Sequence, residues 1–250
     1  MPARGSSSRQ GTPLSLDAAV ELTRTGDVWL FRGHTVADRA IQLSTNSPVN
    51  HVGMSVVLDD LPPLMWHAEL GRSLPDVWSG AHHRGVQLHV LRDAVLTWGT
   101  RYGQRAWLRQ LHQPGGEVTR EMEDALLRTV ARLDGTPFPS TTRLASRWLL
   151  ARRRPERGTS GGGARQGLFG RVPVRRGGPA PELETAFCAE VVAASYHAMG
   201  LLPDDRGPSW YDPGRFWSGD DLALVGGAWL GGEIAVDLPA GFHKADESVS

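Results

Sequence analysis

The sequence predicts an α+β fold in which an antiparallel sheet packs against helices. Three segments alternate apolar and polar residues with the period of a strand: 51–58, 64–70 and 85–91. The first two form a hairpin, because only five residues separate them. Two longer segments carry apolar residues at helical spacing: 117–135 and 184–202. We expect one domain over residues 15–245, since 250 residues with 40% apolar composition can bury one sizeable core.

The N-terminal part begins with a polar tail. Residues 1–14 are rich in Ser, Gly and Arg and bury too little apolar surface to become ordered, so we expect disorder there. Three elements are expected next: a helix over 16–25, a strand over 26–31 and a helix over 34–48. Ser15 or Asp17 caps the first helix, Gly26 follows its end, and Pro48 ends the second helix.

The predicted hairpin carries polar side chains on one face. His51 and Gly53 share a face of the first strand, and His67 and Glu69 share a face of the returning strand. Counting across the connecting loop puts Glu69 beside Gly53, whereas a turn shifted by one residue on each side puts His67 there. The sequence leaves this register open.

The second half of the chain contains both predicted helices. The helix over 117–135 has an apolar stripe and ends at Gly135. The helix over 184–202 has a face of small residues, which indicates close packing, and Cys188 lies near its start. Residues 221–227 and 233–238 look like short strands separated by Gly-rich turns.

Residues 151–181 differ in composition from the rest of the chain. They hold eight Arg, one Glu, eight Gly and four Pro, a net charge of +7 that leaves −7 elsewhere. This composition predicts a disordered insertion within the domain. The alternative is a basic arm for an anionic partner, but only one aromatic residue, Phe169, lies among the arginines.

The overall composition excludes several classes of protein. The 27 basic and 27 acidic residues cancel, so we expect no nucleic-acid partner. A single Cys excludes an intrachain disulfide and a Cys-based zinc cage. No apolar run approaches the roughly 18 residues that cross a bilayer, and the N-terminus lacks the apolar core of a signal peptide. We therefore expect a cytoplasmic protein, with its oligomeric state undetermined.

Cys188 is the candidate nucleophile. In the first turn of the predicted helix, unpaired backbone N–H groups and the helix dipole favour a thiolate and can hold an oxyanion. The alternative is that a lone cysteine is a small buried apolar residue. His197 follows nine residues later, about two and a half helical turns, so it cannot meet the thiol.

A cysteine nucleophile needs a base and a group that orients the base. His51 begins a strong strand after a turn-like segment, so its ring can lie at the mouth of a cleft. His67 and Glu69 point the same way as His51, and either could accept the N–H of its ring.

Three further histidines are candidate metal ligands: His82, His83 and His89. The adjacent pair on a loop cannot both point inward, and no carboxylate or Cys completes the set at a typical spacing. We expect no metal and no other cofactor.

Three short motifs occur in a fixed order: Gly26–Asp27, Asn50–Gly53 and Cys188–Val191. In this order they resemble the circularly permuted NlpC-type papain-like cysteine hydrolases, the branch that holds YiiX-like bacterial proteins and lecithin–retinol acyltransferases. The resemblance covers about residues 24–218 without the Arg/Gly-rich insertion. The base precedes the nucleophile, which is the mark of the permutation.

The resemblance implies a permuted papain-like fold, with a barrel-like antiparallel sheet and the nucleophile at a helix N-terminus. It also implies a hydrolase or acyltransferase acting on an amide, ester or thioester bond of a peptide or lipid. In that chemistry His51 would deprotonate Cys188. YiiX-like members usually carry Glu where this chain has His67, whereas the acyltransferases use a second His. We therefore prefer His67 as the third member, with Glu69 as the alternative.

A non-catalytic interpretation competes with this one. The papain-like cleft would then serve binding alone, and the basic 151–181 segment would recruit an anionic partner. A redox sensor built on Cys188 is disfavoured, because the chain has no second Cys to resolve an oxidised thiol.

Overall fold

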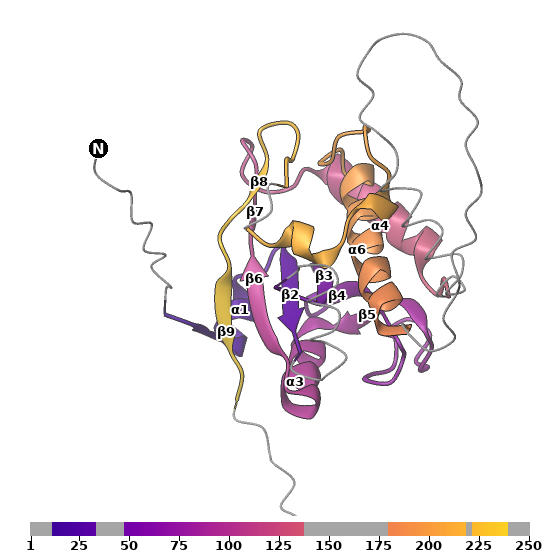
Figure 1. Ribbon diagram of the computed structural model, residues 1–250. Helices are drawn as coiled ribbons and strands as arrows, with labels where there is room; N and C mark the ends of the chain where they lie inside the picture. The colour runs from indigo at the N-terminus through magenta and orange to yellow at the C-terminus, as the bar shows by residue number, and fades with distance from the viewer. Residues whose placement is uncertain (1–11, 34–47, 138–179, 219–221, 240–250) are drawn as a thin grey trace, which may run out of the picture.

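The computed structural model describes residues 12–33, 48–137, 180–218 and 222–239, with the backbone alone described over 180–186 (Figure 1). The helix predicted over 34–48 lies outside these residues except for Pro48, and so does the 151–181 insertion as far as residue 179. None of the described helices is long and apolar enough to span a membrane.

The described strands build one large sheet and one small one. The large sheet has the order β1-β9-β6-β2-β3-β4-β5 and is antiparallel except for the β1–β9 pair. Its strands are β1 Leu14–Ser15, β2 Val28–Arg32, β3 His51–Val56, β4 Leu64–Glu69, β5 Gly85–Val90, β6 Arg105–Arg109 and β9 Ile234–Asp237. The small sheet pairs β7 Leu111–His112 with β8 Trp229–Leu230. Within the described residues the large sheet stays open, with β1 and β5 at its edges, so the predicted barrel is wrong there.

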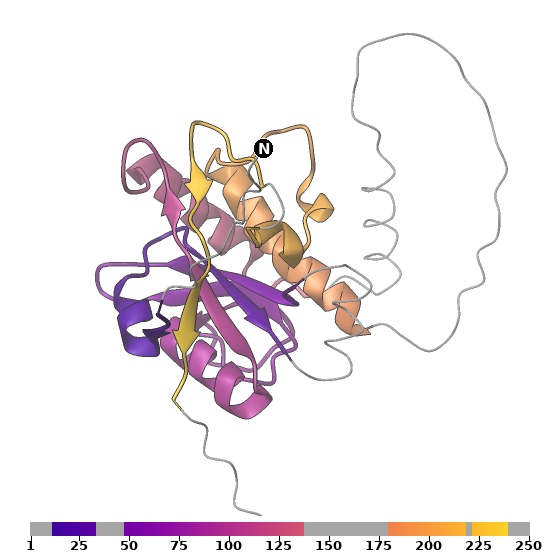
Figure 2. The ribbon, with the colours of Figure 1, turned by 60° about the vertical axis from the view of Figure 1, so that its left-hand side comes forward.

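Helices cover both faces of the large sheet, which confirms the predicted α+β class. They are α1 Leu16–Glu21, α3 Leu91–Tyr102, α4 Arg120–Leu133 and α6 Ala180–Ala198, with 3-10 turns η1 Pro208–Trp210 and η2 Pro213–Phe216. On one face α6 packs on β3 and β4, and α4 packs on α6. On the other face α3 packs on β4, β5 and β6. Figure 2 shows α6 (orange) and α3 (magenta) on opposite sides of the sheet.

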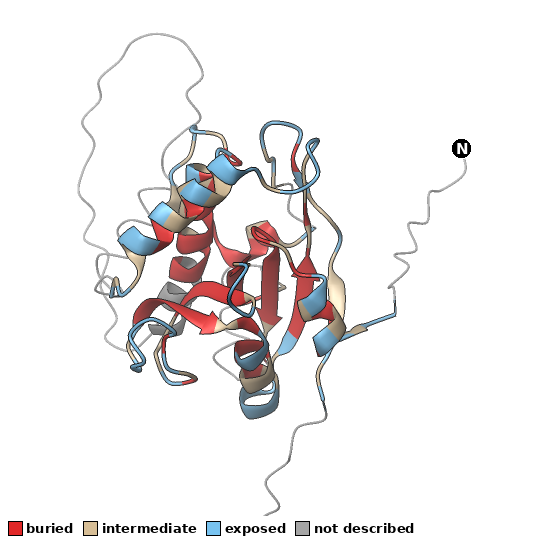
Figure 3. Cartoon of the chain, turned by 180° about the vertical axis from the view of Figure 1, so that it is seen from behind, coloured by how far each residue is buried: buried red, intermediate tan, exposed pale blue. Residues whose placement is uncertain are grey.

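Each face of the sheet buries its own apolar core, and Figure 3 shows the central strands as almost continuously buried. The sheet contributes to the core on the α6 side Val28, Leu30, Val52, Met54, Trp66 and Leu88. The core on the α3 side contains Trp29, Phe31, Met65 and Leu108 from the sheet and Leu91, Val95 and Trp98 from α3. Because successive residues of a strand point to opposite faces, the alternation in the sequence sorts these side chains between the two cores.

Local signals mark the ends of two helices, both of which are shorter than predicted. Helix α1 ends at Glu21, so Gly26 does not follow its end directly, and α4 spans Arg120–Leu133 within the predicted 117–135. The Ser15 hydroxyl accepts the backbone N–H of Ala18 at 3.2 Å and caps α1, as expected. Thr119 caps α4 in the same way by accepting the N–H of Met122 at 3.4 Å. Gly135, just past α4, has φ of +70°, a left-handed conformation that suits glycine.

The β3–β4 hairpin confirms the shifted register. Met54 pairs with Trp66, so the next position along the same register sets Gly53 opposite His67. A Cβ added at Gly53 would overlap the Met65 sulfur, so a larger residue here would have to displace the flexible Met65 side chain. The same added atom would lie 3.4 Å from the His67 Cβ, which agrees with the pairing.

Asp27 ties the start of β2 to the rest of the sheet. Its buried carboxylate accepts the backbone N–H of Leu111 at 2.7 Å and that of Arg24 at 2.8 Å. Next to it, the Tyr196 hydroxyl donates to the Gly26 carbonyl at 2.7 Å. These bonds join the N-terminal region, β7 and α6 at one end of the sheet.

Several boundaries differ from the prediction. Leu14, assigned to the disordered tail, pairs with Val236 and belongs to β1. Helix α6 begins at Ala180, so it includes the last two residues of the predicted insertion. The 222–227 part of the predicted strand 221–227 is not a strand, because it contains a turn with left-handed Gly226. No element was expected over 92–116, where the structure has most of α3 and all of β6.

Candidate active site

Three histidines form a row on the sheet face that α3 covers. Nε2 of His51 lies 3.2 Å from Nδ1 of His67, and Nε2 of His67 lies 3.1 Å from Nδ1 of His89. The three rings come from β3, β4 and β5, which are neighbours in the sheet. His67 and His89 are fully buried, whereas His51 is half-buried at the start of its strand. In such a row, the ring nitrogen that carries the proton in one histidine determines which nitrogen carries it in the next.

Trp98 of α3 packs against two of these rings. Its ring centroid lies 5.0 Å from that of His51 and 4.8 Å from that of His67, both edge-on. Phe31 of the neighbouring strand β2 also packs against His51, with 5.8 Å between the two ring centroids. These contacts hold the imidazoles in an apolar setting and limit their rotation.

Glu69 lies at the end of the same face and is held by its own partners. Both of its carboxylate oxygens accept the Ser73 hydroxyl, at 2.7 and 2.6 Å. Burial raises the pKa of Glu69, although hydrogen bonds from Ser73 and Trp98 oppose this shift. Glu69 therefore does not replace His67 as the hydrogen-bond partner of His51.

Burial keeps the three imidazoles neutral at pH 7. It lowers the pKa of His51 from 6.5 to about 4, with a smaller contribution from His89. Burial also lowers the pKa of His89 to about 4, against the opposing effect of Asp76. The pKa of His67 lies well below 6.5 for the same reason, and its two histidine neighbours add to the shift. Neutral rings carry one lone pair each and can accept a proton or bind a metal.

Cys188 lies on the other face of the sheet. It is fully buried in the core on the α6 side, together with Val52 and Met54. The His51 ring packs instead against Phe31 and Trp98, which belong to the core on the α3 side. Cys188 and the imidazole row therefore belong to the cores on opposite faces of the sheet.

Along the strand direction, α6 places Cys188 toward the His51 end of β3. The Trp66 indole N–H donates to the Ser195 hydroxyl at 3.1 Å, and Tyr196 bonds to Gly26 near the far end of β3. Cys188 precedes Ser195 by seven residues, a rise of about 10 Å away from Gly26. The thiol and His51 thus lie near the same end of the sheet on opposite faces.

The predicted position of Cys188 in the first turn of a helix is wrong. Helix α6 begins at Ala180, so Cys188 is its ninth residue and lies more than two turns inside it. Only the first four N–H groups of a helix lack a partner within it, so the Cys188 N–H is not one of the unpaired donors. The oxyanion role expected from the helix end therefore loses its basis.

The structure brings the predicted residues His51 and His67 together, with Glu69 at the end of the same row. It adds two residues that the sequence argument missed, His89 and Trp98. His89 was grouped with His82 and His83, but its position in the 85–91 alternation places it on the face of Gln87, which pairs with His67. That alternation was the signal that could have found it.

One group of side chains has the composition and spacing of a metal site: His67, Glu69 and His89. One ligand atom from each lies within 4.8 Å of the others. This group differs from the set of His82, His83 and His89 considered from the sequence. Pairing of β4 with β5, rather than sequence spacing, brings its members together.

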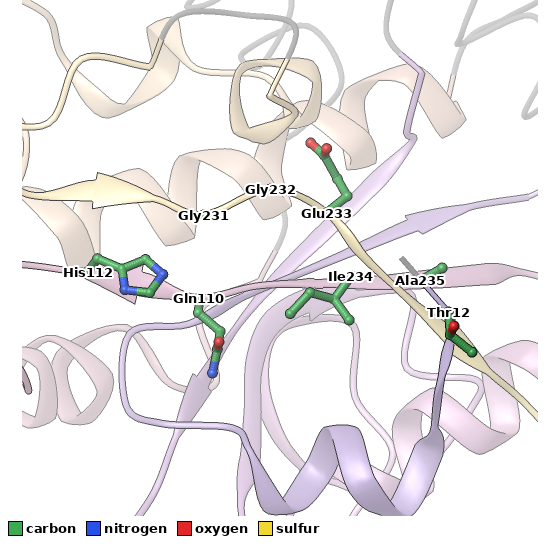
Figure 4. A pocket seen from close by; sticks show the side chains of 8 residues that line it. All are labelled: Thr12, Gln110, His112, Gly231, Gly232, Glu233, Ile234 and Ala235. Carbon is green, nitrogen blue, oxygen red and sulfur yellow. The ribbon is translucent and has the colours of Figure 1, made fainter. Parts of the chain in front are cut away.

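A separate hollow of about 300 Å³ lies at the β6–β9 side of the molecule (Figure 4). It is lined by Thr12, Gln110, His112, Gly231, Gly232, Glu233, Ile234 and Ala235. None of these residues belongs to the histidine row. The Glu233 carboxylate accepts the N–H and hydroxyl of Ser218, so its charge already has partners within the fold.

Comparisons with known proteins found similarity among solved structures. No family model matches the chain, and no curated protein matches it significantly. The chain is similar to the crystal structure of the metalloprotein YiiX from Escherichia coli O157:H7, described as DUF1105, with 19% sequence identity and a TM-score of 0.40. The match covers 70% of this chain and 65% of that one, just under two thirds of its length. The permuted papain-like relation stays a prediction.

Proposed function

We propose that the protein is a cysteine-dependent hydrolase or acyltransferase acting on an amide, ester or thioester bond. The observation that carries this proposal is the 3.2 Å contact between His51 Nε2 and His67 Nδ1. It supplies a half-buried neutral base whose ring is held by a second, fully buried imidazole. A pair of this kind is what a nucleophilic thiol requires for activation.

In the proposed reaction His51 acts through its other ring nitrogen. Its Nε2–H donates to His67 Nδ1, which leaves Nδ1 of His51 to accept the proton of the Cys188 thiol. The thiolate attacks the carbonyl carbon, and the imidazolium returns the proton to the departing amine, alcohol or thiol. Water or an acceptor alcohol then adds to the thioester, gives its proton to His51 and releases Cys188, with water yielding hydrolysis and an alcohol yielding acyl transfer.

The reaction places a clear demand on the fold. Cys188 and His51 lie toward the same end of the sheet but on opposite faces, so the thiol must reach the ring around the first residue of β3. Because Cys188 is fully buried, the part of α6 that contains it must also move to admit a substrate.

Thiol alkylation tests the pairing without knowledge of the substrate. Iodoacetamide labelling of the full chain would be followed by mass spectrometry in wild type, His51→Gln and His112→Gln, with Cys188→Ala as the blank. We expect labelling faster than that of an ordinary thiol, a fall of about a hundredfold in His51→Gln and no change in His112→Gln. Equal rates in wild type and His51→Gln would overturn the pairing.

A substrate panel then tests the chemistry. Peptide, ester and thioester substrates would be incubated with wild type and Cys188→Ala, and the intact protein would be weighed for an acyl adduct. An adduct on Cys188 with turnover supports the proposal. Turnover that survives Cys188→Ala would exclude cysteine catalysis.

A non-catalytic binding module is the second candidate, and the burial of Cys188 within α6 favours it. In that case the basic 151–181 segment recruits an anionic partner while the papain-like surface binds. Labelling of Cys188 no faster than that of an ordinary thiol, together with no acyl adduct, supports this candidate over the enzyme.

A further inference from the structure

His67 and His89 face each other in a way that suits a shared metal ion. Nε2 of His67 lies 3.1 Å from Nδ1 of His89. Two imidazole nitrogens that bind one zinc ion at about 2.0–2.1 Å lie roughly 3.0–3.4 Å apart, depending on the coordination angle. The two nitrogens therefore need little movement to become neighbouring ligands.

Glu69 supplies an anionic third donor. A carboxylate oxygen of Glu69 lies within 4.8 Å of the ligand nitrogens of both histidines. Two histidines and one carboxylate are a donor set that zinc accepts, with a fourth position left for water.

One buried polar atom beside this set lacks a hydrogen-bond partner in the described part of the chain. It is Oε1 of Gln87, and Gln87 pairs with His67 across the strands. An orphaned buried atom of this kind indicates an ion or water that the polypeptide alone does not supply.

The residues around the set already orient its members. Ser73 holds the carboxylate of Glu69, and His51 holds the second ring nitrogen of His67. Metal ligands in proteins are normally fixed in this way by a hydrogen bond to the atom that does not bind the metal.

We infer that His67, Glu69 and His89 form a binding site for a divalent transition-metal ion such as zinc, and that the bound ion switches off His51 as a base. The first part stands on the geometry of the three donors. The second part rests on the proposed function.

The switch follows from counting protons on the three rings. Without metal, His51 and His67 each carry the proton on Nε2, and each donates it to Nδ1 of the next ring. Zinc takes the lone pairs of His67 Nε2 and His89 Nδ1, so the His67 proton moves to Nδ1 and points at His51 Nε2. His51 must then carry its own proton on Nδ1, the atom that would receive the Cys188 proton. Each ring keeps one proton throughout, and only the direction of the hydrogen bonds reverses.

Zinc affinity tests the site without any activity assay. Competition with a chromogenic chelator would be measured on full-length Cys188→Ala, which removes the thiol as a ligand, and on the same protein with Glu69→Gln, His89→Gln or His112→Gln added. We expect one zinc per chain, affinity at least tenfold weaker in Glu69→Gln and His89→Gln, and unchanged affinity in His112→Gln. Unchanged affinity in both ligand variants, or no binding by Cys188→Ala, would overturn the site.

Cobalt gives a readout that does not depend on stability. Co²⁺ added to Cys188→Ala should give visible d–d absorption from a nitrogen and oxygen site, and the signal should be lost in His89→Gln. A His89→Gln protein that melts like its parent and keeps the same spectrum would contradict the assignment.

The switch is tested by Cys188 alkylation with and without zinc. We expect zinc to slow labelling of wild type at least tenfold, a chelator to restore it, and Glu69→Gln to resist the same zinc concentration. Equal slowing in Glu69→Gln would mean that zinc binds the thiol directly, and the switch would be wrong. If Cys188 is unreactive without zinc while Cys188→Ala still binds the ion, the proposed function fails and the metal site stands.

Discussion

The indole N–H of Trp66 donates to the Ser195 hydroxyl at 3.1 Å, and this buried bond joins β4 to α6. Ser195 in turn donates to the Val191 carbonyl of its own helix at 3.0 Å. Because Trp66 pairs with Met54 in the sheet, the bond sets the position of α6 along β3. The position of Cys188 relative to His51 along the direction of β3 therefore depends on this contact.

Removing the acceptor of that bond should destabilise the protein. Ser195→Ala leaves the buried indole N–H without a partner, so we expect a loss of about 1–3 kcal/mol in the free energy of unfolding. Denaturant unfolding would measure it, with Trp66→Phe and the double variant completing a cycle. A coupling energy near zero would show that the bond does not position α6.

The choice between His67 and Glu69 gives a second prediction. His67 bonds to His51, whereas Glu69 is held by Ser73, so His67→Gln should slow Cys188 alkylation more than Glu69→Gln does. We expect a difference of about tenfold or more, measured with a chelator present. The reverse ranking would assign the positioning role to Glu69, and no effect from either would exclude the triad.

The buried carboxyl of Asp27 should make the free energy of unfolding fall as the pH rises. Burial raises the pKa of Asp27 from 3.8 to about 6, against two backbone hydrogen bonds that oppose the shift. The folded state holds this proton more tightly than the unfolded state, so Asp27 favours folding below about pH 4 and this contribution is lost as the pH rises through 6. Relative to Asp27→Asn, wild type should lose up to about 3 kcal/mol between pH 4 and 7.

Denaturant unfolding of both proteins at several pH values would measure this difference. Comparison with Asp27→Asn removes the contribution of the other titrating groups, including the three histidines. A wild-type curve parallel to that of the variant would show that the carboxyl is ionised throughout.

We expect Arg109→Lys to destabilise the protein even though the substitution keeps the positive charge. Its buried guanidinium donates to the carbonyls of Gly231, Leu230 and Phe216, and it thereby holds the C-terminal segment on β6. Arg109→Lys keeps the charge but not the three directed bonds, so we expect a loss of about 2–4 kcal/mol. Thermal unfolding would show it, with exposed Arg105→Lys on the same strand staying within about 0.5 kcal/mol. A similar change in both variants would argue against this anchoring role.

The Arg/Gly-rich segment gives a prediction from the sequence. Its residues bury too little apolar surface to offset about 1–2 kcal/mol per residue of ordering entropy. Replacing residues 151–179 by a short Gly/Ser linker should keep the melting temperature within a few degrees of wild type. The deletion stops before Ala180, where α6 begins. An unfolded deletion protein would show that the segment packs on the core.

The sequence predicted those elements whose signal is local. The alternation in β3, β4 and β5 and the apolar stripe of α4 depend on neighbouring residues, and all four elements lie within the predicted ranges. The start of α6 was placed four residues late, because Gly and Pro before it masked the helical pattern. Strand β6 was missed, since it lies between β2 and β9 and its burial on both faces leaves little alternation to detect.

By itself the sequence determined which side chains share a strand face, because that follows from the two-residue period of a strand. It therefore identified His51, His67 and Glu69 as residues of one surface. Only the tertiary structure decided that His67 reaches His51, that His89 joins the row, and that Cys188 packs on the opposite face. Those outcomes depend on strand register and on which face each helix covers. Both are set by contacts between segments far apart in the chain, where a shift of one residue exchanges the faces.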